Sequence, residues 1–290
     1  MRGIWQSTSV QMQMVYLLLL LIVSFVVFYL IGVVGMLVGG APNMLDLSDG
    51  NTMAVLKWMQ GCSAVGLFVA PPLLFAYFTK HQLGWNSISR QQLLLAIAFM
   101  LLSMPFVNGL AVWNESLHLP SFLGSLESWM RQAEAEAMRM TEAFLVMETP
   151  LDLLVNLLII AVIPAVGEEL LFRGVIQKLF LKWNGKVHLS VWLTAFLFSA
   201  VHMQFLGFFP RLILGAVLGY MLVWSGSLWL PIVAHFTNNA FAVLVTYFIG
   251  IDKVSPSMES IGSEGGSIIL ISGLGCLLLL YFIRELSETK

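Results

Sequence analysis

The chain has 290 residues, of which 59% are hydrophobic and 10% are charged, with a net charge of −2 and a mean hydropathy of +0.88. Soluble globular proteins carry about 25% charged residues, so this composition excludes a soluble domain and indicates a polytopic membrane protein. The small net charge argues against nucleic acid as a partner. The two cysteines, Cys62 and Cys276, lie in apolar runs and form neither a disulfide framework nor a C-x-x-C metal motif.

Eight apolar segments are long enough to cross a bilayer, since a hydrocarbon core of about 30 Å needs about 20 apolar residues per helix. The predicted spans are residues 14–38, 55–78, 92–112, 151–170, 189–206, 211–225, 228–249 and 266–283. The first is longer than the apolar part of a signal peptide, which indicates a retained span. We therefore predict an all-α membrane protein with about eight transmembrane helices, forming a single domain over residues 1–290.

This domain divides into N-terminal spans (1–113), a connector (114–150), a central core (151–250) and a last span with the C-terminal tail (251–290). Within the connector, apolar residues recur every three or four positions over residues 121–148: Phe122, Leu126, Trp129, Ala133, Ala137, Met140, Phe144 and Met147. The pattern predicts an amphipathic helix whose polar face carries glutamates. We expect a connector lying on the outer membrane surface; the alternative is a lid or gate for a substrate.

The distribution of lysine and arginine predicts the orientation in the membrane. With both termini in the cytoplasm, eight of these residues lie on the cytoplasmic side: Arg2, Lys80, Arg90, Lys178, Lys182, Lys186, Arg284 and Lys290. Five lie on the opposite side: Lys57, Arg131, Arg139, Arg211 and Lys253. Cytoplasmic loops carry the excess of such residues, so we expect both termini in the cytoplasm of a multi-pass protein of the bacterial inner (plasma) membrane.

The fourth predicted span contains Glu168, Glu169 and Arg173. A charge at the centre of a spanning helix costs about 2.5–3.5 kcal/mol on insertion scales, so an ionisable residue there suggests a function. Glu169 and Arg173 are four residues apart with the acid first, which predicts a structural ion pair. Glu168 has no cationic residue three or four positions further along the chain, so it is the candidate for a catalytic role.

Two later spans hold the other deep polar positions, Phe198 with His202 in "FSAVH" and His235 with Asn239 in "HFTNN". A lone histidine in a membrane usually makes an interhelical hydrogen bond, but three polar sites of catalytic types favour a shared site. At a rise of about 1.5 Å per residue, Glu168 and His202 lie at equal depth from the turn near Gly185. His235 lies at the same depth as these two residues if the hairpin formed by the fourth and fifth spans projects about 10 Å into the cytoplasm.

The segments "EELLFR", "FSAVH" and "HFTNN" resemble the EExxxR, FxxxH and HxxxN motifs of the CPBP family, also called the ABI family. This family contains CAAX proteases and bacteriocin-processing enzymes, including Ras-converting CAAX endoproteases. The resemblance covers about residues 150–250. It implies a hydrolase, an intramembrane endopeptidase that cleaves a membrane-associated or lipidated peptide or protein.

The resemblance also implies roles for individual residues. Glu168 would be the general base, and His202 would help to position the attacking water. His235 and Asn239 would donate hydrogen bonds to the oxyanion. Glu169, Arg173 and Phe198 would support the site.

Three alternatives remain at this point. Glu168, His202 and His235 could instead bind zinc, and the family is often labelled metalloprotease; because H-E-x-x-H is absent, we favour a site without a metal or other cofactor. The chain could also be an immunity-type membrane protein that binds a peptide without cutting it. A proton-coupled transporter is less favoured, because the sequence has no inverted repeat.

Overall fold

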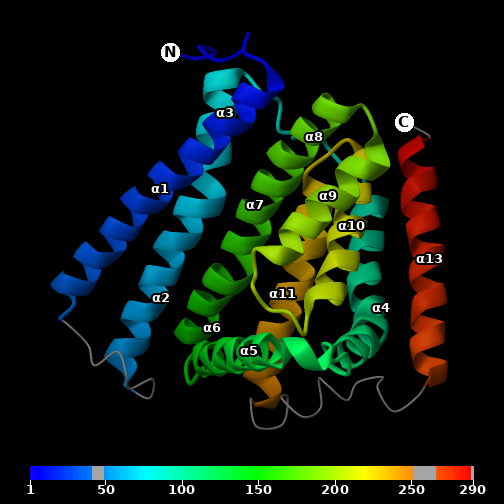
Figure 1. Cartoon of the computed structure of the whole chain (residues 1–290). Coiled ribbons are helices and arrows are strands. Elements are labelled where there is room, and N and C mark those ends of the chain that lie inside the picture. Colours follow the sequence, from blue (N-terminus) through cyan, green and yellow to red (C-terminus); the bar gives the residue numbers. More distant parts are fainter. Residues whose placement is uncertain (41–48, 251–265, 289–290) are drawn as a thin grey trace.

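The computed structural model describes residues 1–40, 49–250 and 266–288 of the chain. Within these residues the protein is all-helical, and its only β-type pairing is an isolated bridge between Trp85 and Ser227. Figure 1 shows the helices as a bundle, with the end of α13 and the start of α1 at the same end. Two cations that entered the predicted orientation, Lys253 and Lys290, lie outside the described residues, as does the start of the predicted C-terminal segment 251–290.

Seven helices of the described residues are long and apolar enough to cross a membrane. Five of them are single elements: α1 (Val10–Val38), α4 (Arg90–Glu115), α10 (Phe208–Ser225), α11 (Trp229–Ile249) and α13 (Gly266–Glu288). The sixth is a continuous helix made of α2 (Gly50–Ala64), η1 (Val65–Val69) and α3 (Ala70–Thr79). The seventh is a continuous helix made of α6 (Pro150–Asn156), η3 (Leu157–Val162), α7 (Ile163–Glu169), η4 (Leu170–Ile176) and α8 (Gln177–Asn184). A shorter apolar helix is α9 (Val187–Ala200). Every predicted span thus contains an apolar helix, and the predicted fold class is confirmed.

The helix of the fourth span continues beyond residue 170 to Asn184 and ends at Gly185, which has a φ of +68°; this agrees with the expected turn near Gly185. One predicted boundary is wrong. The fifth span was expected to reach residue 206, but α9 ends at Ala200 and residues 201–207 form a loop. This apolar stretch leaves the helix because its main chain bonds elsewhere: Phe205 O accepts from Asn114, and Leu206 N donates to Glu134.

Capping residues in the sequence mark the starts of two helices. Ser89 with Gln92, and Thr149 with Asp152, form reciprocal capping boxes at the starts of α4 and α6, which satisfy backbone N–H groups that lack a partner in the first turn. These caps start a new helix after each connecting segment.

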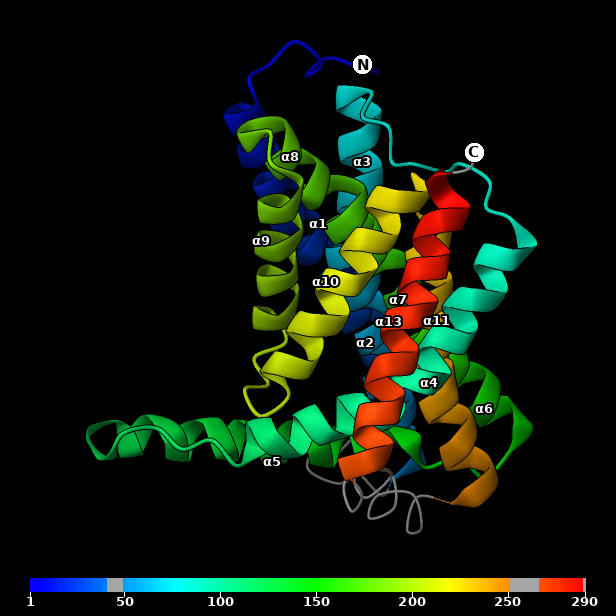
Figure 2. The same ribbon diagram turned by 90° about the vertical axis from the view of Figure 1, so that its right-hand side faces the viewer.

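The predicted amphipathic connector is a helix, α5 (Gly124–Leu145), preceded by a single 3₁₀ turn, η2 (Ser121–Leu123). Figures 1 and 2 show α5 running across the end of the bundle, opposite to the N-terminus. None of its residues is fully buried. The helix lies across the end of the bundle, extends beyond it in Figure 2 and is not one of its spans.

The helix that carries the charged motif is the centre of the packing. Residues of η4 (Leu170, Phe172 and Val175) are buried in a cluster with side chains from several other helices, among them Phe75 in α3 and Phe198 in α9. A second buried cluster joins α4, α10, α11 and α13. Three π-helical stretches, η1, η3 and η4, lie next to α7 in sequence or in space. Single π-turns inside α-helices occur frequently at functional sites.

Candidate active site in the membrane core

The predicted pair of Glu169 and Arg173 is present and fully buried. Arg173 Nη1 donates to Glu169 Oε1 at 2.7 Å, and both side chains are 0% exposed. Arg173 Nη2 donates to the carbonyl of Gly215 in α10 at 2.9 Å. The guanidinium carbon also lies 4.5 Å from the centre of the Phe198 ring. This arginine therefore connects the helix that carries Glu168, Glu169 and Arg173 (α7 and η4, called the motif helix below) to α9 and α10.

Glu169 has a second partner that the sequence spacing did not indicate. His235 Nδ1 lies 2.9 Å from the same Oε1 atom. Since a carboxylate accepts hydrogen bonds, Nδ1 carries the proton and donates. The ring orientation is thereby fixed, and the other nitrogen, Nε2, points toward Glu168 Oε2 at 3.9 Å. α11 is thus joined directly to the motif helix at the two adjacent glutamates.

Glu168 differs from its neighbour in its partners. The Oε2 atoms of both glutamates are buried without a hydrogen-bond partner among the described residues. Glu169 Oε1, however, accepts from Arg173 and His235, whereas Glu168 accepts no hydrogen bond from a described residue. A distance of 3.9 Å to His235 Nε2 is too long for a direct hydrogen bond. One water molecule could bond to both atoms at once. The arrangement fits a carboxylate that is kept available for a water or a substrate.

His202 lies just beyond the end of α9. Its Nδ1 donates to the carbonyl of Phe198 at 2.7 Å, which leaves Nε2 as the acceptor of the neutral ring. The ring packs edge-on against Phe198 at a centroid distance of 5.1 Å, and the ring of His235 lies 6.0 Å from Phe198 on an edge-on approach. Phe198 thus spaces the two histidines. Among the described residues, His202 forms no hydrogen bond or ion pair with Glu168.

Asn239 is engaged with the main chain. Its Nδ2 donates to the carbonyl of Ile160 in η3 at 3.1 Å, and its Oδ1 accepts from Asn238 Nδ2 at 3.2 Å. The amide therefore bonds to the helix of Glu168 about two turns away from the carboxylates. Of the polar motifs, the structure places His235 beside the two glutamates, while His202 and Asn239 bond to main-chain carbonyls. Figure 2 shows the α8–α9 turn projecting beyond the α10–α11 turn.

Arg211 lies near the site, although the sequence predicted for it only a position on the side of the membrane opposite to the cytoplasm. Its Nη1 and Nη2 donate to the carbonyl and Oε1 of Gln204, at 2.9 and 2.6 Å. It forms no ion pair with a carboxylate in the described part of the chain, and it lies within electrostatic range of Glu168 and His202. A side chain at Gly207 would place Cβ 2.6 Å from Nη2, so the glycine makes room for this guanidinium. An arginine nine residues after His202 at the start of an apolar segment was the available signal.

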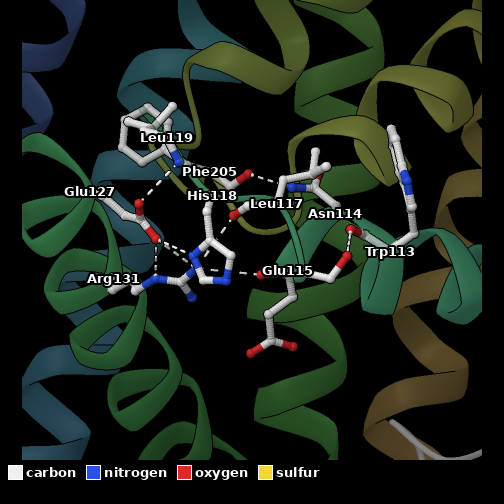
Figure 3. A network of polar contacts seen from close by, with 10 residues as sticks. Trp113, Asn114, Glu115, Leu117, His118, Leu119, Glu127, Arg131 and Phe205 are labelled. Carbon is white, nitrogen blue, oxygen red and sulfur yellow. Dashed lines mark hydrogen bonds and ion pairs between the residues drawn. The ribbon is translucent and has the colours of Figure 1, made fainter. Parts of the chain in front are cut away.

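A polar network closes the corner between α4 and α5, beside the loop that follows His202 (Figure 3). Glu127 accepts from His118 Nδ1 at 2.8 Å, from the N–H of Leu119 at 3.0 Å and from Arg131 Nε at 3.0 Å. These hydrogen bonds lower the pKa of Glu127 to about 2, with His118 contributing most. A cavity of about 320 Å³ lies next to the network and is lined further by Asn114, Met130, Phe205, Leu206, Phe208 and Phe209.

The geometry bears on the zinc alternative. In the described residues, no three side chains of histidine, cysteine, aspartate or glutamate lie close enough together to hold a metal ion. Glu168, His202 and His235 therefore do not form a ready-made ligand set in this arrangement. Zinc dependence stays a prediction for a chelation experiment.

Residues 150–241 match the sequence model of the family described as "Type II CAAX prenyl endopeptidase Rce1-like". The resemblance to CAAX proteases is confirmed. The matched residues of this CAAX-protease-like core include Glu168, Glu169, Arg173, His202, His235 and Asn239.

The chain is also similar to one curated protein. The chain is 30% identical over 111 residues to "Uncharacterized protein YpbD" of Bacillus subtilis (strain 168), which covers 36% of this chain and 54% of that protein. The chain thus spans about half the length of this relative. No solved structure matches the chain. Together with the seven long apolar helices, the family match indicates an integral, multi-pass membrane protein whose residues 150–241 are similar to CAAX-type proteases.

Proposed function

We propose that the protein is an intramembrane endopeptidase that hydrolyses a peptide bond in a membrane-associated or lipidated peptide or protein. The observation that carries the proposal is the buried carboxylate of Glu168, which, unlike that of Glu169, accepts no hydrogen bond from a described residue and whose Oε2 lies 3.9 Å from the Nε2 atom of His235. An unpaired carboxylate inside a membrane is costly and is retained where it has a function. It lies in the segment that matches the CAAX endopeptidase family.

In the first step, Glu168 accepts a proton from a water molecule bound beside it. The water oxygen forms a bond to the carbonyl carbon of the substrate, and the carbonyl oxygen becomes an oxyanion. The C–N bond then breaks, and the protonated Glu168 returns the proton to the leaving amine. The neutral His202 ring, whose Nδ1 is held by the Phe198 carbonyl, offers Nε2 as a hydrogen-bond acceptor for the same water.

His235 is the proposed donor to the oxyanion. Because its Nδ1–H is directed at Glu169, Nε2 carries a proton only when the ring is an imidazolium. The positive charge of that form lies between Glu168 and Glu169. An N–H fixed in a site that excludes water stabilises a developing oxyanion strongly. Glu169 and Arg173 hold the ring and the motif helix in place.

The test compares Glu168→Gln with the wild type in purified protein, using a prenylated, internally quenched peptide that ends in a C-a-a-X sequence as the probe. We expect cleavage to fall to background while abundance and the thermal midpoint stay near wild type, since glutamine keeps the shape and removes the base. Natural substrates would be sought by comparing the termini of membrane proteins in cells carrying the wild type or Glu168→Ala. Retention of cleavage by Glu168→Gln would rule out this mechanism.

We also propose that both termini face the cytoplasm of a bacterium. The α8–α9 turn, which carries Lys182 and Lys186, lies at the same end of the bundle as the N-terminus (Figure 1). With Cys62 and Cys276 replaced by serine, a cysteine at Asn184 should react with an impermeant maleimide only in opened cells. Labelling in intact cells would show that the protein has the opposite orientation in the membrane.

A further inference from the structure

Asn239 donates a hydrogen bond to the carbonyl of Ile160, four residues before Pro164. This bond suggests a role for Asn239 that differs from the donation to an oxyanion that the family resemblance implies. We propose that Asn239 is a positioning residue that replaces the hydrogen bond removed by Pro164 and thereby holds the helix of Glu168 in register. The inference rests on the proposed function for its effect on activity. It does not use Asn239 as a donor to the oxyanion.

Pro164 interrupts the hydrogen bonds of a continuous helix. It lies inside the helical stretch Pro150–Asn184 and has no N–H group. In an α-helix the N–H of residue 164 would bond to the carbonyl of residue 160, so the proline deprives Ile160 of this donor. The preceding residue is also out of α-helical register, because the N–H of Ile163 bonds to Leu158, five residues back.

Asn239 supplies a replacement donor from another helix. Its Nδ2 lies 3.1 Å from the Ile160 carbonyl. Its Oδ1 accepts a hydrogen bond from Asn238 at 3.2 Å, so both ends of the amide are used and its orientation is set. In the hydrocarbon region no water is available to satisfy a free carbonyl, and neighbouring side chains must do so where a proline breaks a spanning helix.

The same helix, α11, therefore holds the motif helix at two points. The first is the bond from Asn239 to Ile160, and the second is the bond from His235 to Glu169. Glu168 is adjacent to the second point and eight residues from the first. Because a displacement of about 1 Å in a catalytic group can cost about 10²-fold in rate, release of the first point will disturb the 3.9 Å spacing of Glu168 and His235.

The experiment restores the missing N–H. Four purified proteins are compared with the prenylated probe peptide: wild type, Asn239→Ala, Pro164→Ala and the double variant. We expect Asn239→Ala to lose about 10–10²-fold in kcat, with a lower thermal midpoint and little change in KM. Pro164→Ala should be near wild type. In the double variant the N–H regained at position 164 reaches the Ile160 carbonyl, and kcat should return to within about threefold of Pro164→Ala.

A matched control and an opposite outcome make the test decisive. Pro105→Ala in α4 removes another proline inside a helix but is not next to Ile160, so it should not rescue Asn239→Ala. If Asn239 instead donates to the oxyanion, its loss of about 10²–10³-fold in kcat remains in the double variant. That result would overturn the inference.

The thermal midpoints separate this inference from the proposed function. If no variant, including wild type, cleaves the probe but Pro164→Ala restores the midpoint lost in Asn239→Ala, the proposed function fails and the positioning bond stands. If the midpoints of the two single variants simply add, the inference fails whatever the activity. Should Asn239→Ala not accumulate in membranes, accumulation of the double variant is the rescue, and its absence counts against the inference.

Discussion

The described residues contain a cluster of one glutamate, one arginine and one histidine twice, once inside the bundle and once at its end. In the core, Glu169 binds Arg173 at 2.7 Å and His235 at 2.9 Å. At the α4–α5 corner, Glu127 pairs with Arg131 at 3.0 Å and with a histidine, His118, at 2.8 Å (Figure 3). In each cluster the arginine follows the glutamate by four residues.

What distinguishes the two clusters is their surroundings. The glutamate and arginine side chains are 0% exposed in the core, but 19% and 35% exposed at the corner. The core glutamate is preceded by a second acid, Glu168, whereas the corner glutamate is preceded by Leu126. Exposed ion pairs are screened by water and salt and stabilise little, while a buried pair cannot lose one member without leaving a charge unpaired. Identical local spacing thus has different consequences.

The largest expected effect is the loss of one partner of the core pair. Glu169→Gln or Arg173→Ala should destabilise the protein by about 3–5 kcal/mol, because one buried charge is left without its partner. Abundance in membranes and the thermal midpoint of the purified protein measure this effect. If Glu169→Gln folds normally but is inactive, while Glu168→Gln unfolds, the roles assigned to these two acids are reversed.

The next effect compares the two histidines. His235→Ala should lower kcat by about 10²–10³, the usual cost of one oxyanion donor, with KM little changed. His118→Ala, made in the same way at the other cluster, should leave kcat within about twofold, because it lies outside the proposed machinery. Equal losses in both variants would argue that neither histidine acts on the substrate.

A smaller effect is expected from the corner pair. Glu127→Gln should leave abundance and activity near wild type, but amide hydrogen exchange should become faster at Leu119, whose N–H bonds to Glu127. The pKa of Glu127 in the folded protein, about 2, lies below its usual value. Its stabilising contribution is therefore present above about pH 4.5 and is lost as the pH falls through about 2. Unchanged exchange in Glu127→Gln would show that this pair does not hold the corner.

The smallest effect is expected from metal removal. Purified active protein should contain far less than one zinc ion per chain, and a strong chelator should leave its activity unchanged. Loss of activity and stoichiometric zinc together on chelation, with recovery on adding zinc back, would make Glu168, His202 and His235 metal ligands. That outcome would separate the core cluster from the corner cluster by chemistry as well as by burial.

Short-range patterns in the sequence determined much of the molecule. Apolar length predicted every spanning helix, and the three-to-four-residue periodicity predicted α5. The spacing of Glu169 and Arg173 predicted their ion pair, because residues four apart in a helix always share a face. The motifs further indicated which segments meet in the core.

Only the tertiary structure decided what each side chain meets. His235 bonds to Glu169 across 66 residues of sequence, and Asn239 bonds to Ile160 across 79. The end of α9 at Ala200 depends on bonds from Asn114 and Glu134, which belong to other helices. Helical periodicity carries no information about which distant helix lies opposite, and burial, which separates the two glutamate–arginine–histidine clusters, arises only when the helices pack.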